Sequence, residues 1–151
     1  MLFTGHSKGT VLVIEDCPEV QRYLRVMLEL DHYHVEVAGN GEDGVRRIRD
    51  GCTPQVVLLD MQMPGINGLQ TLQQLKELSP DVKVIMCSAE DDPAVIRDAI
   101  VRGAKAYLVK PIQHLYLTAA VERCLAPSAN PSHAREVRVL TMPATHLSRT
   151  N

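Results

Sequence analysis

Residues 55–69, QVVLLDMQMPGINGL, decide the fold. The run over 55–59 is apolar after its first residue, which is typical of a strand buried on both faces at the centre of a parallel sheet. Asn67 is a favourable helix cap, and leucines follow it at positions 69, 72, 75 and 78. The segment therefore predicts a strand, a loop and an amphipathic helix, which together form one βα unit.

Four further units of the same kind surround this segment. Their apolar runs lie at residues 10–14, 33–38, 82–87 and 106–109. Helical patterns follow these runs and begin at Pro18, Gly41, Pro93 and Ile112. Five units in about 120 residues predict an α/β fold, a doubly wound five-stranded parallel sheet with five helices in the flavodoxin-like order 2-1-3-4-5.

Details of these units make finer predictions. The run over 33–38 alternates polar and apolar residues, so it is expected near an edge of the sheet. Gly51 is expected to end the second helix in the left-handed conformation, and Gly103 is expected to end the fourth helix. The inward face of the last helix is expected to carry Ile112, Leu115, Tyr116, Ala119, Ala120 and Cys124.

Length and composition point to one globular domain. The chain has 151 residues, of which 45% are hydrophobic and 23% charged, so a disordered chain is a poor fit. We expect an extension over 1–9, one domain over 10–125 and a linker-like flexible tail over 126–151, where AlaProSerAlaAsnPro begins a different composition. Aromatic residues make up only 3% and the net charge is −2, so direct binding of nucleic acid is not expected.

The sequence also predicts a cytoplasmic protein that does not enter a membrane. No apolar run approaches the roughly 20 residues of a membrane span, and the first residues lack the apolar region of a secretory signal. The four cysteines lie 35 to 37 residues apart with no CxxC pair, so structural zinc and a disulfide framework are disfavoured. Reduced, mostly buried thiols are expected instead.

Acidic residues follow the first and third predicted strands. Glu15 and Asp16 come directly after the first strand, and Asp60 follows the third. These strands are neighbours in the predicted order, so the three carboxylates should converge beyond the carboxyl ends of the strands. Like charges this close require a cation or a retained proton, and an all-oxygen ligand set favours Mg²⁺.

Groups of the opposite kind follow the fourth and fifth strands. Ser88 supplies a hydroxyl and Lys110 an ammonium group, which could hold the oxygens of a transferred phosphoryl group. Asp60 is the natural nucleophile because it lies at the centre of the sheet, and it would form an acyl phosphate.

At these residues the sequence resembles the response regulator receiver domains of two-component signalling, the chemotaxis receiver among them. The matching segments appear in the family's order and spacing over about residues 10–125. They are VLVIED (11–16), LLDMQMPGINGL (58–69), VIMCSAE (84–90) and AYLVKPI (106–112).

The resemblance implies a role for each site residue. Asp60 would be the phosphoacceptor, and Mg²⁺ would be bound by Glu15, Asp16, Asp60 and the main-chain carbonyl of Gln62. Ser88 and Lys110 would contact the phosphoryl oxygens, and Tyr107 would be the switch aromatic, which turns inward when the Ser88 hydroxyl moves towards phosphate. The Lys110-Pro111 bond would be cis.

The resulting prediction is a phosphorylation-dependent switch and not an enzyme. A sensor histidine kinase or a phosphotransfer protein would phosphorylate it. The fourth helix, fifth strand and fifth helix would then bind a downstream protein or a second copy. One alternative is a receiver module of a longer DNA-binding or enzymatic response regulator.

Two other classes of protein fit less well. A phosphohydrolase with an aspartyl-phosphate intermediate usually has an acid two residues after the nucleophile, where this chain has Gln62. A flavin-binding module needs a phosphate loop after the first strand, where this chain has Glu15-Asp16-Cys17-Pro18. Gln62 and Glu90, each two residues after a site residue, could instead tune access of water to the phosphoryl group.

Overall fold

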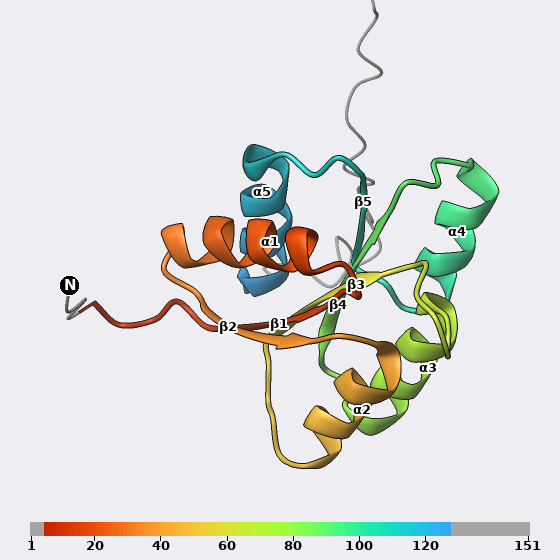
Figure 1. Cartoon of the computed structure of the whole chain (residues 1–151), viewed down its shortest axis with the longest axis horizontal. Coiled ribbons are helices and arrows are strands. Elements are labelled where there is room, and N and C mark those ends of the chain that lie inside the picture. The colour runs from red at the N-terminus through yellow and green to blue at the C-terminus, as the bar shows by residue number, and fades with distance from the viewer. Residues whose placement is uncertain (1–4, 128–151) are drawn as a thin grey trace, which may run out of the picture.

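The computed structural model describes residues 5–127 and shows alternating strands and helices (Figure 1). The strands are β1 (Thr10–Ile14), β2 (His34–Ala38), β3 (Val56–Asp60), β4 (Lys83–Ser88) and β5 (Ala106–Val109). The helices are α1 (Pro18–Leu30), α2 (Gly41–Arg49), α3 (Gly68–Leu78), α4 (Pro93–Val101) and α5 (His114–Leu125).

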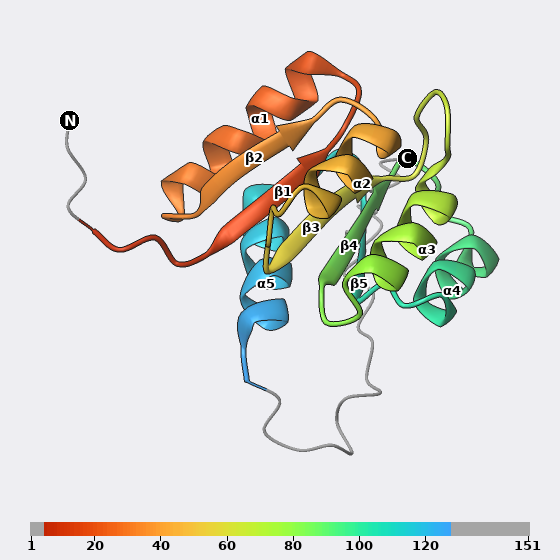
Figure 2. The same ribbon diagram turned by 90° about the horizontal axis from the view of Figure 1, so that it is seen from below.

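The strands form one parallel sheet in the order β2-β1-β3-β4-β5 (Figure 2). This confirms the predicted doubly wound fold, with β3 at the centre and β2 at an edge. Strands β3 and β4 each begin and end one residue later than predicted. Asp60 is therefore the last residue of β3, where it pairs with Cys87, and Ser88 is the last residue of β4.

Helices cover both faces of the sheet, so the protein has two apolar layers (Figure 1). Helices α1 and α5 pack on one face through residues such as Leu24, Leu28 and Leu117. Helices α2, α3 and α4 pack on the other face, where Leu72 and Leu75 are fully buried. Burial on both faces explains why β1 and β3 are apolar without alternation.

Local signals in the sequence set the helix ends. Asn67 forms a capping box with Gln70 at the start of α3, and Pro18 and Pro93 are the first residues of their helices. Gly51 adopts a φ angle of 107°, which confirms its predicted left-handed conformation, and Gly103, which follows α4 as predicted, has a similar φ of 113°.

The predicted inward face of the last helix is wrong in part. Leu115 is 76% exposed and Ala119 is also exposed, whereas Leu117 and Val121 are fully buried. Ile112 is buried but precedes the helix, which begins at His114. Apolar residues of α5 spaced three and four apart fit two neighbouring faces of the helix, so the sequence does not distinguish them. Packing against the sheet buries the face with Leu117 and Val121.

The remaining predictions concern cysteines, membranes and the tail. All four cysteines are free thiols; Cys87 is buried, whereas the other three are half-buried, so the expected general burial is only partly correct. Burial raises the pKa of Cys87 to about 12. Across residues 5–127, no helix has the length and apolar character needed to cross a membrane. The predicted tail over 126–151 lies outside the described residues except for positions 126 and 127.

Candidate phosphorylation site

Three carboxylates meet at the carboxyl ends of β1 and β3, as the strand order predicts. Glu15, Asp16 and Asp60 each place a carboxylate oxygen within 4.8 Å of the others. Glu15 and Asp60 are buried, and Asp16 is exposed. Burial, followed by repulsion from Asp60, raises the pKa of Glu15 above its ordinary value. The cluster is therefore a partly buried site with concentrated negative charge.

Lys110 connects this cluster to the end of β5. Its Nζ atom lies 3.1 Å from Oε2 of Glu15 and 3.4 Å from Oδ1 of Asp60. Burial alone would lower the pKa of Lys110, but Asp60 and Glu15 more than offset this effect and raise it. The Lys110-Pro111 peptide bond is cis, as expected. A positively charged ammonium group thus lies directly beside the Asp60 carboxylate.

Ser88 and Tyr107 both contact the loop between β4 and α4. The Ser88 hydroxyl, which is fully buried, accepts a hydrogen bond from the Glu90 N–H group at 3.0 Å. Tyr107 is also fully buried, and its hydroxyl donates to the Glu90 carbonyl at 2.9 Å. Tyr107 therefore points inward, and Glu90 is held through its main chain by both side chains. From the sequence, Glu90 is expected only to tune access of water to the phosphoryl group, and no sequence pattern reveals this main-chain role.

Comparison with known sequences decides the family of this chain. Residues 11–122 match the response regulator receiver domain family. The chain belongs to this family. The match covers the described fold except for the first residue of β1 and the last three residues of α5, so the receiver domain and the fold described above coincide.

Individual relatives of this receiver domain fall into two kinds. The chemotaxis protein CheY of Listeria monocytogenes is 34% identical over 114 residues, which cover 75% of this chain and 95% of CheY. The nitrate/nitrite response regulator protein NarL of Escherichia coli is 31% identical over 143 residues, which cover 89% of this chain but only 66% of NarL. The receiver is thus similar to a protein of about its own length and to part of a longer one.

A solved structure supports the same assignment. The receiver domain of DrrB, in its BeF3-activated form, is 26% identical and superposes with a TM-score of 0.70. The similarity covers 78% of this chain and 97% of the DrrB chain.

The carboxylates of this receiver fit a divalent cation. Three carboxylates and the one ammonium group of Lys110 leave a formal charge of −2 when all are ionised. The donor set consists of oxygen atoms only, and the exposed Asp16 leaves one side open to water. Mg²⁺ prefers oxygen ligands and retains several waters, so charge and donor chemistry both suit this ion.

Two supporting residues were missed by the sequence analysis. The side-chain amide of Gln21, on α1, donates a hydrogen bond to the Glu15 carbonyl. The Cys17 N–H group donates to the Glu15 carboxylate at 3.3 Å. Both contacts hold the acidic turn between β1 and α1, and neither residue type carries a signal for this role in the sequence.

The loop after β3 also depends on a glycine that sequence reasoning overlooked. The Gln62 N–H group donates to Oδ1 of Asp60 at 3.2 Å, and Met61 and Met63 on either side of Gln62 pack in the core. A Cβ atom at Gly68 would lie 2.7 Å from the Asp60 carbonyl and 2.6 Å from the Met61 Cα atom. A glycine at the first position of a helix, directly after its cap, is the signal that could have revealed this close approach.

The Gly68→Ala variant is expected to lose roughly 1–3 kcal/mol of unfolding free energy, because main-chain atoms beside Asp60 must move to admit the methyl group. Urea denaturation measures the change. The control is Gly39→Ala, whose added Cβ would meet only Gln21 at 4.0 Å, and its denaturation midpoint should be nearly unchanged. Equal midpoints for the two variants would contradict the close packing at Gly68.

Proposed function

We propose that Asp60 accepts a phosphoryl group from a phosphohistidine of a sensor histidine kinase or phosphotransfer protein. The observation that carries the proposal is the buried Asp60 carboxylate, which has Lys110 at 3.4 Å and two further carboxylates within 4.8 Å. An Asp60 oxygen attacks phosphorus, the P–N bond breaks, and its electron pair remains on the imidazole nitrogen. The product is an acyl phosphate.

Mg²⁺ would be held by Glu15, Asp16, Asp60 and the main-chain carbonyl of Gln62. When bound, it supplies positive charge that stabilises the transferred phosphoryl oxygens. Lys110 supplies a second positive charge from the protein itself, and its contact with Asp60 places that charge beside the attacking oxygen. The Gln62 N–H group holds the Asp60 carboxylate in position.

Phosphorylation would change the state of the protein through Ser88 and Tyr107. A phosphoryl group on Asp60 adds negative charge and acceptor oxygens, which attract the Ser88 hydroxyl. Ser88 and Tyr107 both hold the main chain of Glu90, so a movement of Ser88 alters the loop that leads into α4. The output face would be formed by α4, β5 and α5, and it would bind a downstream protein or a second copy.

The unit that carries this function is proposed to span residues 10–125 and to act in the cytoplasm. Free thiols at all four cysteines suit a reducing compartment. The match with NarL covers only 66% of that protein. The alternative proposal is therefore a receiver module of a longer regulator, in which another part binds DNA or has enzymatic activity. The chain would not hydrolyse phosphate esters with multiple turnover, because Gln62 occupies the position where a phosphohydrolase would need an acid. The chain would also not bind nucleic acid directly.

Beryllofluoride, a phosphoryl mimic, tests the proposal together with its metal requirement. We expect main-chain NMR signals around Asp60, Ser88 and Glu90 to shift only when beryllofluoride and Mg²⁺ are both present, because the mimic binds the Asp60 carboxylate, which is also a proposed ligand of the ion. Removal of Mg²⁺ with EDTA should reverse the shifts. Shifts of equal size without Mg²⁺, or in Asp60→Asn, would refute the assignment of this site.

A further inference from the structure

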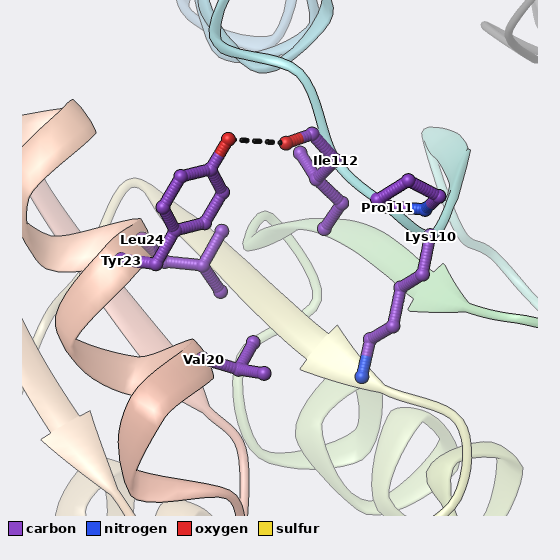
Figure 3. Close-up of a pocket in the computed structure, with 6 residues that line it drawn as sticks. All are labelled: Val20, Tyr23, Leu24, Lys110, Pro111 and Ile112. Atoms are coloured by element: carbon purple, nitrogen blue, oxygen red, sulfur yellow. Dashed lines mark hydrogen bonds between the residues drawn. The ribbon is translucent and has the colours of Figure 1, made fainter.

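Tyr23, on α1, reaches across to the segment that joins β5 to α5. Its hydroxyl donates a hydrogen bond to the Ile112 carbonyl at 2.9 Å (Figure 3). Tyr23 is 50% exposed, so burial alone does not fix its ring. The hydrogen bond therefore holds the ring in place and ties α1 to a segment 89 residues later in the chain.

A pocket of about 430 Å³ lies between α1 and this segment. Its lining consists of three residues from the helix and three from the segment, which are Val20, Tyr23, Leu24, Lys110, Pro111 and Ile112 (Figure 3). Side chains that face a pocket have fewer packing neighbours on that side, so packing between the two walls is weak here. The Tyr23 hydrogen bond spans the pocket and supplies a fixed contact between the walls.

The same segment carries Lys110, whose ammonium group lies beside the carboxylates of the site. The Lys110 N–H group donates to the Ser88 carbonyl at 2.8 Å, which holds the main chain directly after β5. Tyr23 holds the main chain again two residues later, at the Ile112 carbonyl. The two hydrogen bonds together fix the main chain from which the Lys110 side chain extends.

Helix α1 also holds the other member of the ion pair. The Gln21 amide donates a hydrogen bond to the Glu15 carbonyl, and the Cys17 N–H group donates to the Glu15 carboxylate. Gln21 and Tyr23 are two residues apart on the helix. One helix therefore sets the positions of both Glu15 and the segment that carries Lys110, and so the distance between the two charges.

From these contacts we propose that Tyr23 is a positioning residue for Lys110. Its hydroxyl holds segment 110–112 so that the ammonium group lies against Asp60 and Glu15. The proposal rests on the proposed function, in which Lys110 stabilises the phosphoryl group transferred to Asp60. Tyr23 does not touch the reacting atoms. Without its hydroxyl the segment is free to shift, and the ammonium group is no longer fixed beside the attacking oxygen.

Tyr23→Phe tests this role because it removes the hydroxyl and keeps the ring. Phosphorylation by acetyl phosphate and Mg²⁺ should slow about three- to tenfold, which is the usual effect of losing one hydrogen bond. In a Lys110→Met background the same substitution should have no further effect, since it acts through the missing ammonium group. The control is Tyr116→Phe on α5, whose hydroxyl forms no hydrogen bond with any described residue, and its rate should equal that of the wild type.

A measurement without a phosphodonor reports on Lys110 itself. The NMR signal of the Lys110 Cε atom can be assigned by its absence in Lys110→Met. We expect this signal to shift in Tyr23→Phe, because the ammonium group moves relative to the carboxylates, and to stay unchanged in Tyr116→Phe.

A second contact between α1 and α5 separates positioning from general support of the fold. Asp31, directly after α1, accepts a hydrogen bond from the Thr118 hydroxyl at 2.6 Å and lies 3.0 Å from Nε2 of His114. Asp31→Ala removes both contacts at the end of α1 distant from Tyr23. It should lower the urea denaturation midpoint and leave the phosphorylation rate as in the wild type.

Three results would overturn the proposal. They are a wild-type rate in Tyr23→Phe, an effect of Tyr23→Phe that persists in full in the Lys110→Met background, and an equal loss of rate in Asp31→Ala. A wild type that accepts no phosphoryl group would refute the proposed function instead. In that case an unchanged Lys110 signal in Tyr23→Phe would still overturn the positioning role, and a shifted signal would support it.

Discussion

Asp60→Asn is expected to reduce phosphorylation by acetyl phosphate and Mg²⁺ to the level seen without a donor. The amide cannot form an acyl phosphate, and the other two carboxylates are placed differently. Asp60 ends the central strand. Its Oδ1 atom accepts a hydrogen bond from the Gln62 N–H group and forms an ion pair with Lys110. Glu15 is held through its two oxygens by the Cys17 N–H group and Lys110, and Asp16 is exposed. Intact-protein mass spectrometry reports the phosphorylated fraction directly.

A matched control uses an aspartate outside the site. Asp81 is exposed in the turn before β4, and Asp81→Asn makes the same chemical change. It should be phosphorylated to the same extent as the wild type. Circular dichroism should show that both variants are folded. Unchanged phosphorylation of a folded Asp60→Asn variant would mean that another residue is the acceptor.

Lys110→Met is expected to slow phosphorylation by about 100-fold, the usual effect of removing one group that stabilises developing negative charge. It should also lower the free energy of unfolding by about 2–3 kcal/mol, because Glu15 and Asp60 lose their only nearby cation among the described residues. Lys110 is 25% exposed, so the loss falls below that of a fully buried pair. Methionine keeps most of the side chain's packing volume and removes only the charge.

Two measurements separate these effects. Phosphorylation rates come from a time course with acetyl phosphate, and stability comes from urea denaturation without Mg²⁺. The control is Lys105→Met, which replaces an exposed lysine directly before β5 and should change neither quantity appreciably. A Lys110→Met variant with the wild-type phosphorylation rate and stability would show that the contacts of Lys110 with Glu15 and Asp60 contribute to neither quantity.

Most of the fold is predictable from the sequence because its strands are buried on both faces. Unbroken apolar runs identify β1 and β3, and turn residues such as Asn67 and Gly103 fix where the helices start and stop. The last helix shows the limit of this reasoning. Its sequence is apolar enough to allow two inward faces, and only packing against the sheet places Leu117 inside and Leu115 outside.

The chemistry of the site is predictable for a related reason. The carboxyl ends of adjacent parallel strands must meet, so the order of the strands alone brings Glu15, Asp16 and Asp60 together. The roles of Gln21 and Gly68 are not predictable in this way. Each depends on how closely one main-chain segment approaches another, and no periodicity or spacing in the sequence reports that distance.

The central claim is that a single acyl phosphate forms on Asp60, and its position is directly measurable. Borohydride reduction converts an aspartyl phosphate into homoserine. The wild type would be incubated with acetyl phosphate and Mg²⁺, reduced, digested and mapped by peptide mass spectrometry. Homoserine is expected at position 60 and at no other aspartate, and none is expected when Mg²⁺ is removed beforehand. Homoserine at position 16 with Asp60 intact, or a stable phosphate on serine or histidine, would contradict the claim.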